Sequence, residues 1–396
     1  MKQATLKLTA LVMLVGSVFV VNAQSTANSI NVVTTAVPFL RISPDARSGG
    51  MGDVGVATIP DANSCFWNQA KYPFAVSKSA ISVTYTPWLK GLDLNDVYLA
   101  SLAGYYKLDD EGTQAISASL RYFSLGNIQF TDGLGNPLQQ YRPREFAFDA
   151  GYSRKLSDKL GVGIALRYIN SNLASGQSAG GSTYKAGTAV AGDLSLFHDG
   201  TSGSSDGSGL NWGIALSNLG SKISYTNDAS EKDFIPANLG LGVAYVKAFD
   251  ESNKVTFGLD INKLLVPTPP LSSDTAGLIA YHTKGVVSSW FSSFTDAPGG
   301  FSEELKEFQI SVGAEYSYMD QFLFRAGYFY ENPTKGDRQY FTIGAGLNYN
   351  MFGLNFSYLV PSGNGINRNP LSNTLRFSII FNLDKSTAVG TTTTQQ

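Results

Sequence analysis

The chain has 396 residues, of which 43% are hydrophobic and only 15% are charged, and its formal net charge at pH 7 is −2. Soluble domains usually carry roughly 25% charged residues, so the composition is unusual for a soluble protein, and the lack of a basic excess disfavours a nucleic-acid partner. The 41 glycines, 20 tyrosines and 24 phenylalanines favour strands over helices. Cys65 is the only cysteine in the sequence, which excludes an internal disulfide framework.

The first residues have the pattern of an export signal. Lys2 and Lys7 precede the apolar run 8–21, and the small residue Ala23 stands where a signal peptidase cuts, so we expect a signal peptide over 1–23. No later stretch of about 18 apolar residues predicts a membrane-spanning helix. The exported chain is expected either to be soluble in the periplasm or outside the cell, or to cross the outer membrane as a β-barrel.

Residues 24–77 lack regular alternation but contain the pattern Gly-x-Gly-x-x-Gly at 50–55. That pattern binds a dinucleotide when a buried strand precedes it and a helix follows it. Prolines interrupt both flanks, at Pro38 and Pro44 before the glycines and at Pro60 after them, so we expect no nucleotide cofactor. The glycines are instead expected to allow tight turns where side chains would not fit. This region is predicted either to plug the lumen of a barrel or to extend into the periplasm.

From about residue 78 onward, apolar side chains alternate with small or polar ones, as in NLGLGVAYV at 238–246. Such alternation predicts β-strands. A second face of glycine, serine, alanine and asparagine suits the crowded interior of a membrane barrel whose outer face meets lipid. Because lipid cannot hydrogen-bond the backbone, these strands have to close, which predicts an all-β transmembrane antiparallel barrel. Fourteen segments show the pattern: 79–88, 96–107, 113–124, 143–156, 159–171, 184–197, 209–219, 236–249, 253–264, 307–318, 321–331, 340–350, 352–360 and 371–383.

The connections indicate which strand ends face outward. Long connections follow odd-numbered strands and short ones follow even-numbered strands, as expected for a single-chain barrel with both chain ends in the periplasm. The clearest long connections are 125–142, 220–235 and 265–306. The Gly/Ser-rich segment 199–209 departs from this rule, so either that turn is extended or the strand count is wrong nearby. After the barrel region, 78–383, we expect the polar, threonine-rich tail 384–396 to be disordered.

The segment 265–306 has no strand pattern and is the longest connection. Connections longer than about 15 residues are usually functional or disordered, and apolar side chains in such numbers are rarely left exposed without a partner. Two interpretations remain open: a lid folded over its own barrel, and a docking surface for another protein. The side chains that we expect to contact a partner are Leu278, Ile279, Trp290, Phe291 and Phe294.

The sequence contains two histidines that could activate a nucleophile, His198 and His282. His198 adjoins the Gly/Ser-rich turn, and His282 lies in the long loop among serines and aspartates that such loops contain by chance. No spacing of histidine, cysteine or carboxylate residues suggests a metal site. We therefore expect no enzymatic activity and no metal or cofactor site.

The run 42–58, ISPDARSGGMGDVGVAT, closely resembles the PorV family (also called LptO) of outer-membrane barrel proteins of the type IX secretion system. The segments 61–64 and 67–71 resemble an element of the wider FadL family, but Gln69 and Lys71 replace its proline and glycine. This departure weakens any transfer of FadL-type substrate transport to this chain. The resemblance implies a FadL-like barrel of about 14 strands with an N-terminal plug over 24–77. The motif residues that we expect to seat this plug are Gly49, Gly50, Gly52, Asp53, Gly55 and Asn68.

The resemblance also implies partners and a role in protein secretion. Members of the PorV family associate with the giant translocon barrel (SprA or Sov) and capture cargo proteins by their C-terminal signal domain. They deliver the cargo to the attachment complex, where the sortase PorU removes the signal. The chain is accordingly expected in outer-membrane lipid, as a cargo shuttle that does not itself conduct protein. The alternative is a FadL-like transporter of hydrophobic small molecules, whose plug would move to open a path.

Overall fold

The computed structural model describes residues 30–89, 94, 96–131, 133–179, 182–227, 232–270, 274–360, 371 and 373–383. The chain divides into two units, Met1–Ile30 and Asn31–Gln396, and the second contains every element discussed below. The expected signal peptide, 1–23, and the expected disordered tail, 384–396, lie outside the described residues.

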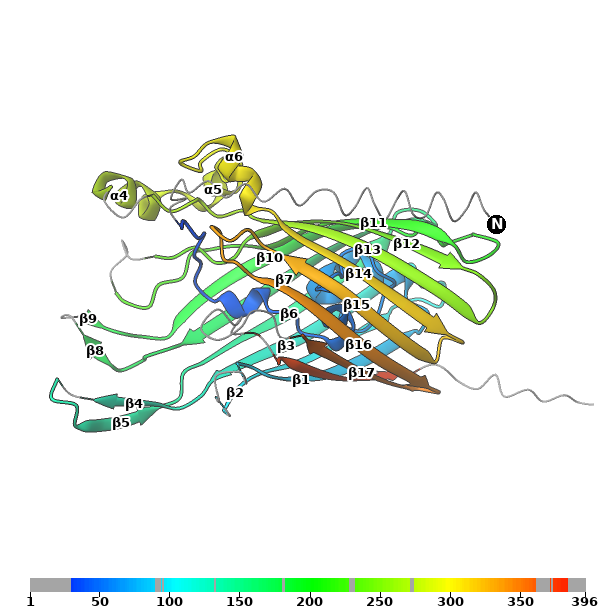
Figure 1. Ribbon diagram of the computed structural model, residues 1–396, viewed down its shortest axis with the longest axis horizontal. Helices are drawn as coiled ribbons and strands as arrows, with labels where there is room; N and C mark the ends of the chain where they lie inside the picture. The colour runs from blue at the N-terminus through cyan, green and yellow to red at the C-terminus, as the bar shows by residue number, and fades with distance from the viewer. Residues whose placement is uncertain are drawn as a thin grey trace, which may run out of the picture. The chain divides into compact units, whose positions relative to one another are not determined.

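Fourteen antiparallel strands form a closed barrel (Figure 1), which confirms the predicted fold class and strand count. Each strand pairs with its neighbours in chain order, and β1 pairs with β18 to close the sheet. The barrel strands are β1 (Ser79–Pro87), β2 (Val97–Lys107), β3 (Gln114–Leu125), β6 (Arg144–Lys155), β7 (Leu160–Asn172), β10 (Gly187–His198), β11 (Gly209–Gly220), β12 (Asn238–Ala248), β13 (Asn253–Leu264), β14 (Gln309–Tyr318), β15 (Phe322–Tyr330), β16 (Gln339–Tyr349), β17 (Phe352–Leu359) and β18 (Leu375–Asn382). Within the described residues, two small hairpins lie outside this sheet: β4 (Ile128–Thr131) with β5 (Pro137–Tyr141), and β8 (Ser178–Ala179) with β9 (Ser182–Thr183).

The barrel is apolar outside and polar inside, the reverse of a soluble protein. On β1, for example, Ile81, Val83 and Tyr85 are exposed, whereas Ser82 and Thr84 between them are buried. An outer surface of this kind is stable against lipid, and a polar interior can enclose other polar groups. Closure also pairs the backbone groups of both edge strands, so that no unpaired edge meets the membrane.

The segment 199–209 is an extended turn between two paired barrel strands. Of the two explanations given above, the extended turn is therefore correct, and the strand count needs no change. β10 ends at His198 and pairs with β11, which begins at Gly209. Within the turn, Asp199 Oδ1 accepts hydrogen bonds from the backbone N–H and the hydroxyl of Thr201 at 2.9 and 2.5 Å. Aspartate side chains commonly stabilise turns by bonding the backbone two residues ahead in this way.

The chain runs through the lumen from one barrel end to the other before it enters β1. It starts at the end with the long connections, where Asn31 N donates to Thr334 O at 3.1 Å. It reaches the opposite end at Ser77, whose hydroxyl donates to Asn382 Oδ1 at 3.3 Å. Four short helices lie on the way (blue in Figure 1): η1 (Pro38–Arg41), α2 (Ala46–Gly50), α3 (Ser64–Trp67) and η2 (Gln69–Phe74). Since α2 packs against β15 to β18 and η2 against β6, β7 and β10, this N-terminal segment occupies the lumen.

The long connection between β13 and β14 is helical. It contains α4 (Thr275–Thr283), α5 (Val286–Ser292), α6 (Phe301–Glu304) and η4 (Leu305–Glu307). The helices lie beyond the barrel, at the end from which the β4–β5 and β8–β9 hairpins also project (Figure 1). In the part of the chain that the structure describes, no helix is long and apolar enough to cross a membrane.

Candidate functional site

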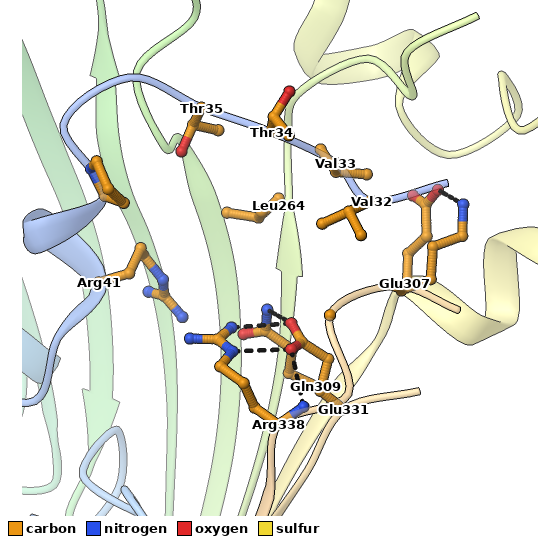
Figure 2. Close-up of a pocket in the computed structure, with 13 residues that line it drawn as sticks. Val32, Val33, Thr34, Thr35, Arg41, Leu264, Glu307, Gln309, Glu331 and Arg338 are labelled. Carbon is orange, nitrogen blue, oxygen red and sulfur yellow. Dashed lines mark hydrogen bonds and ion pairs between the residues drawn. The ribbon is translucent and has the colours of Figure 1, made fainter. Parts of the chain in front are cut away.

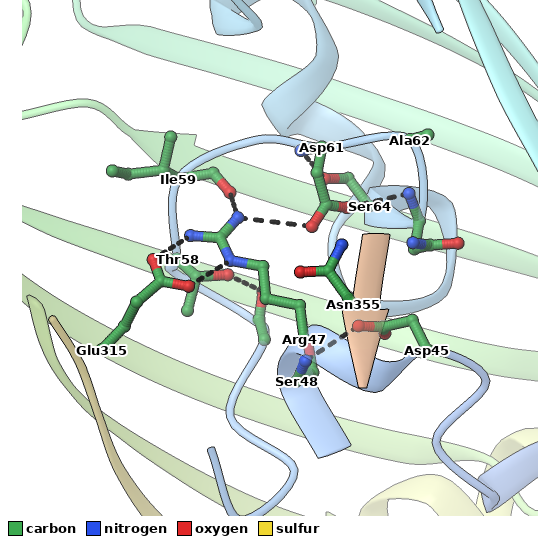
Figure 3. Close-up of polar contacts among 12 residues, drawn as sticks. Asp45, Arg47, Ser48, Thr58, Ile59, Asp61, Ala62, Ser64, Glu315 and Asn355 are labelled. Carbon is green, nitrogen blue, oxygen red and sulfur yellow. Dashed lines mark hydrogen bonds and ion pairs between the residues drawn. The ribbon is translucent and has the colours of Figure 1, made fainter. Parts of the chain in front are cut away.

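Ion pairs inside the lumen join the N-terminal segment to the barrel wall (Figure 3). Arg47 Nε and Nη2 donate to the two carboxylate oxygens of Glu315 on β14 at 3.0 and 2.9 Å. Arg325 Nε, on β15, donates to the same carboxylate at 2.6 Å. Arg47 Nη1 also donates to Ile59 O at 2.8 Å and to Asp61 Oδ2 at 3.3 Å. Because Glu315 is buried, this carboxylate and its two guanidinium partners depend on one another for charge compensation.

Backbone groups of the Gly-rich motif are hydrogen-bonded to side chains of the wall. Gly52 N donates to Thr342 Oγ1 at 2.8 Å. The carboxylate of Asp260 accepts from Gly55 N and Val56 N at 2.7 and 2.9 Å. These buried donors are thereby satisfied away from bulk water. Since side chains of the wall take its N–H groups, the motif attaches the N-terminal segment to the barrel.

Two polar side chains of the motif reach different sides of the barrel. Asn68 Nδ2 donates to Leu196 O on β10 at 2.8 Å. Asp53 Oδ2 accepts from the hydroxyl of Tyr340 on β16 at 2.7 Å. The motif is therefore held by strands that are far apart in the sheet.

The motif glycines lie where the surroundings leave little or no room for a Cβ atom. At Gly52, which has a φ of +70°, an added Cβ would stand 2.5 Å from Tyr328 N. At Gly55, it would stand 2.1 Å from the ring of Trp67. Two other motif glycines lie against the barrel wall, Gly49 beside Arg376 and Gly50 beside Gly344. Glycine is the residue that fits such close approaches and left-handed backbone conformations.

Gly52→Ala is expected to lower the free energy of unfolding by more than the roughly 1–2 kcal/mol that a left-handed conformation costs a residue with a Cβ atom. The excess arises because the new methyl group would meet the backbone of Tyr328. Gly203→Ala is the matched control, since Gly203 has a φ of +71° but no atom within 4 Å of an added Cβ. Urea unfolding in detergent measures both losses, and equal losses would contradict the steric argument.

A buried charge cluster fixes the helical loop to the barrel end. Lys263 Nζ, near the end of β13, contacts Glu304 Oε2 at 3.1 Å and Glu307 Oε2 at 2.7 Å. Lys335 Nζ contacts Glu307 Oε1 at 2.9 Å, and Thr268 Oγ1 donates to the same oxygen at 2.7 Å. All five residues are buried, so the loop rests on a base of paired charges withdrawn from water.

The outer surface of the same loop exposes apolar side chains. Of the five residues predicted to contact a partner, Ile279, Phe291 and Phe294 have exposed fractions of 63%, 75% and 38%. Leu278 and Trp290 are partly buried. Three apolar residues outside that set of five are also exposed: Val287 (59%), Phe301 (75%) and Leu305 (54%). We refer to Ile279, Val287, Phe291, Phe294, Phe301 and Leu305 as the exposed loop set. Exposed apolar side chains in such numbers are typical of a binding surface.

A cavity of about 550 Å³ lies between α4 and the N-terminal segment, and Leu278 lines it. Tyr281, another lining residue, packs against Phe234 with ring centroids 5.6 Å apart. Burial raises the pKa of Tyr281 to about 12, which agrees with the packing of this side chain against Phe234. One side of α4 is thus seated on its own barrel, while Ile279 remains exposed.

A second cavity, of about 290 Å³, lies beside Arg41 of the N-terminal segment (Figure 2). Arg338 lines it and is paired with Glu331 through two hydrogen bonds of 2.8 Å. Arg41 points toward Arg338. This part of the lumen therefore disfavours additional positive charge.

Comparison with known proteins adds a family and a set of similar folds. The family model described as "Type IX secretion system protein PorV" matches residues 24–271. The toluene transporter TbuX of Ralstonia pickettii is 13% identical with a TM-score of 0.49, over 86% of this chain and 98% of that one. The toluene transporter TodX of P. putida is 13% identical with a TM-score of 0.47, over 87% and 99%. A FadL homologue of Pseudomonas aeruginosa is 12% identical with a TM-score of 0.43, over 89% and 100%. At these identities the likeness concerns the fold alone, and no curated protein matches the sequence.

Proposed function

Because the chain belongs to the PorV family of type IX secretion system proteins, we propose that it serves that system as a receptor in the outer membrane. It binds cargo proteins through their C-terminal signal domain at the translocon barrel and carries them to the sortase and attachment complex. The exposed loop set makes contacts with the translocon or the cargo, and no chemical step is catalysed. One observation supports this proposal most directly. The helical loop exposes apolar side chains on its outer surface, while buried ion pairs of Lys263 and Lys335 fix its other side to the barrel end.

The construction of the loop supports a protein-binding role. Aromatic residues supply much of the energy of protein interfaces, and Phe291 and Phe301 are both three-quarters exposed. The cluster around Lys263 and Glu307 holds the underside of the loop in place. A surface that is already ordered loses less conformational freedom on binding, and so retains more of the interaction energy as affinity.

The lumen supports a receptor over the FadL-like transporter of hydrophobic small molecules. Lys71, which replaces a glycine of the FadL-family element, is buried and donates to Gly55 O at 2.8 Å and Thr58 Oγ1 at 3.1 Å. Opening a path along the wall would also separate Arg47 from Glu315. Breaking a buried ion pair costs about 3–5 kcal/mol, so a freely moving plug is disfavoured.

Phe291→Ser combined with Phe301→Ser tests the receptor. Two interface anchors worth about 2 kcal/mol each would together weaken partner capture more than tenfold. The measurement is a quantitative pull-down of translocon and cargo from detergent-solubilised outer membranes, accompanied by an assay of cargo secretion. Val76→Ser is the control, because Val76 is also exposed but lies at the opposite end of the barrel.

The outcome distinguishes the two candidate functions. Normal partner capture and normal secretion by the double variant, at wild-type barrel levels, would contradict the assignment of the exposed loop set. Uptake of a hydrophobic small molecule by the wild-type protein, with no secretion partner recovered, would instead support the transporter.

A further inference from the structure

A small cavity inside the lumen is lined by three arginines. Its volume is about 60 Å³, and Arg41, Arg338 and Arg376 all contribute to its lining. It adjoins the cavity of Figure 2, with which it shares Arg41, Gln309 and Arg338. The arginines come from the N-terminal segment, from the connection that precedes β16 and from β18.

Arg376 is the most deeply buried of the three, at 2% exposure. Among the described residues, its Nε and Nη1 atoms have no hydrogen-bond acceptor. Its ion-pair partner is Asp53, but Nη2 and Oδ1 are 3.9 Å apart, which is too long for a hydrogen bond. A buried charged donor without a partner is strongly unfavourable. The side chain therefore calls for an additional acceptor in this cavity.

A second lining group can donate to an additional acceptor. Ser43 Oγ is buried and, within the described part of the chain, makes no hydrogen bond. Asp53 Oδ1 also makes none, but it is an acceptor, and it faces Arg376 Nη2 at 3.9 Å. Arg41 Nη2 reaches a neutral acceptor, Asn262 Oδ1, at 3.4 Å. Several polar groups around one small cavity are thus unsatisfied together, whereas buried polar groups are nearly always hydrogen-bonded.

The charges around the cavity leave one positive charge in excess. Glu331 compensates Arg338 through its two hydrogen bonds, and Asp53, held by the hydroxyl of Tyr340, is the carboxylate nearest to Arg376. Arg41 makes no ion pair with a carboxylate within 4.0 Å among the described residues. Water could satisfy the hydrogen bonds but would not balance this charge. An anion would accept hydrogen bonds from Arg376 and Ser43 and would also balance the charge, and guanidinium groups bind carboxylate and phosphate oxygens particularly well.

The cavity has room for such a group. A single water molecule needs roughly 10–15 Å³ of this kind of volume, so about 60 Å³ accommodates several atoms. Gly49 contributes to the arrangement, because a Cβ atom at this position would lie 2.7 Å from Arg376 Nη1. The glycine lets the guanidinium group lie against the N-terminal segment, which gives the motif a second role beside tight packing.

We propose that this cavity binds a small anion, a carboxylate or a phosphate, between Arg376 of β18 and Arg41 of the N-terminal segment. The bound anion links the lumen segment to the strand that closes the barrel. Arg338 and the adjoining cavity provide the approach from the long-loop end.

The test is thermal unfolding of the detergent-solubilised full chain at constant ionic strength, set with the sodium salt of a bulky sulfonate. Added sodium acetate or sodium phosphate is expected to raise the unfolding midpoint in a saturable way, because a ligand of the native state stabilises it. Arg376→Gln is expected to lose this dependence. Arg154→Gln is expected to keep it, since Arg154 is exposed at the opposite end of the barrel. A response to acetate alone identifies a carboxylate ligand, and a response to phosphate alone identifies a phosphate.

The proposal is overturned if neither salt raises the midpoint, or if Arg376→Gln responds as the wild type does. Should Arg376→Gln fail to fold, the decision rests on wild-type crystals soaked in sodium bromide. An anomalous peak within contact distance of the Arg376 guanidinium group supports the anion site, and the absence of any peak in this cavity overturns it.

Discussion

Glu315→Leu is expected to lower the free energy of unfolding by about 3–5 kcal/mol, because it leaves two guanidinium groups buried without their shared carboxylate. Arg47 would keep a contact of 3.3 Å with Asp61, and Arg325 would keep a hydrogen bond of 2.8 Å to Asn355. Neither contact replaces the ionic link between the N-terminal segment and β14. Urea unfolding in detergent, followed by the heat-dependent mobility shift of the folded barrel on a gel, measures the loss.

Glu111→Leu is the control for this change, since Glu111 is an exposed carboxylate in a turn and its replacement is expected to stay within about 0.5 kcal/mol of wild type. Adding Arg47→Met to Glu315→Leu should cost less than Arg47→Met alone, because residues of one charge network are coupled. A loss below about 0.5 kcal/mol for Glu315→Leu itself would show that the ion pairs do not hold the N-terminal segment.

Lys263→Met is expected to release the helical loop from its base while the barrel stays closed. The change leaves the buried carboxylate of Glu304 without an ion-pair partner among the described residues, and it leaves Glu307 with Lys335 alone. Removing one partner of a buried ion pair costs about 3–5 kcal/mol locally. Limited proteolysis within 275–307 should therefore accelerate, and partner capture by the exposed loop set should weaken, because the surface is no longer ordered before binding.

The same strand provides a matched control in Lys254→Met. Lys254 contacts Asp320 at 2.7 Å, but the two side chains are 34% and 63% exposed. A surface pair of this kind contributes at most about 1 kcal/mol, so neither the proteolysis rate nor partner capture is expected to change. If Lys263→Met and Lys254→Met gave the same results, this would contradict the claim that the buried ion pairs of Lys263 order the loop.

The alternation of apolar and small residues was sufficient to predict the barrel. Every strand of this sheet has one face toward lipid and the other toward a crowded lumen. An apolar residue therefore indicates the lipid face, and a small or polar residue indicates the lumen face. In Phe341 to Leu347, for example, the exposed positions fall at every second residue. Closure followed from the same reasoning, since strands in lipid cannot leave an edge unpaired.

The base of the loop could not be predicted in this way. Lys263 meets Glu307 across 44 positions of the chain, and neither residue belongs to a local pattern that signals the contact. Helix α4 illustrates a second limit, because Leu278 lines a cavity while its neighbour Ile279 is exposed, and apolar character alone does not distinguish them. Phe301 and Leu305 were missed because they flank acidic residues of a short helix, where no strand periodicity applies.

The lumen network could be anticipated only in outline. The Gly-rich run indicated close packing, but the residues that it packs against come from distant strands. Gly52, for instance, lies against Tyr328 and bonds Thr342. A single sequence contains no signal for such partners, since their proximity is created by closure of the barrel.

The route of the N-terminal segment through the lumen constrains the order in which the barrel assembles. Ala46 N donates to Ser378 Oγ at 2.9 Å, which joins residues 332 positions apart, and the strand that carries Ser378 also pairs with β1. The N-terminal segment is therefore enclosed by the last strand. Contacts of such sequence separation form late, because the whole intervening chain has to be ordered first. Once the barrel is closed and its lumen is filled, the N-terminal segment has no path by which to enter. The segment must therefore already lie in the lumen when β18 pairs with β1. Closure of the barrel and packing of its interior are then a single step.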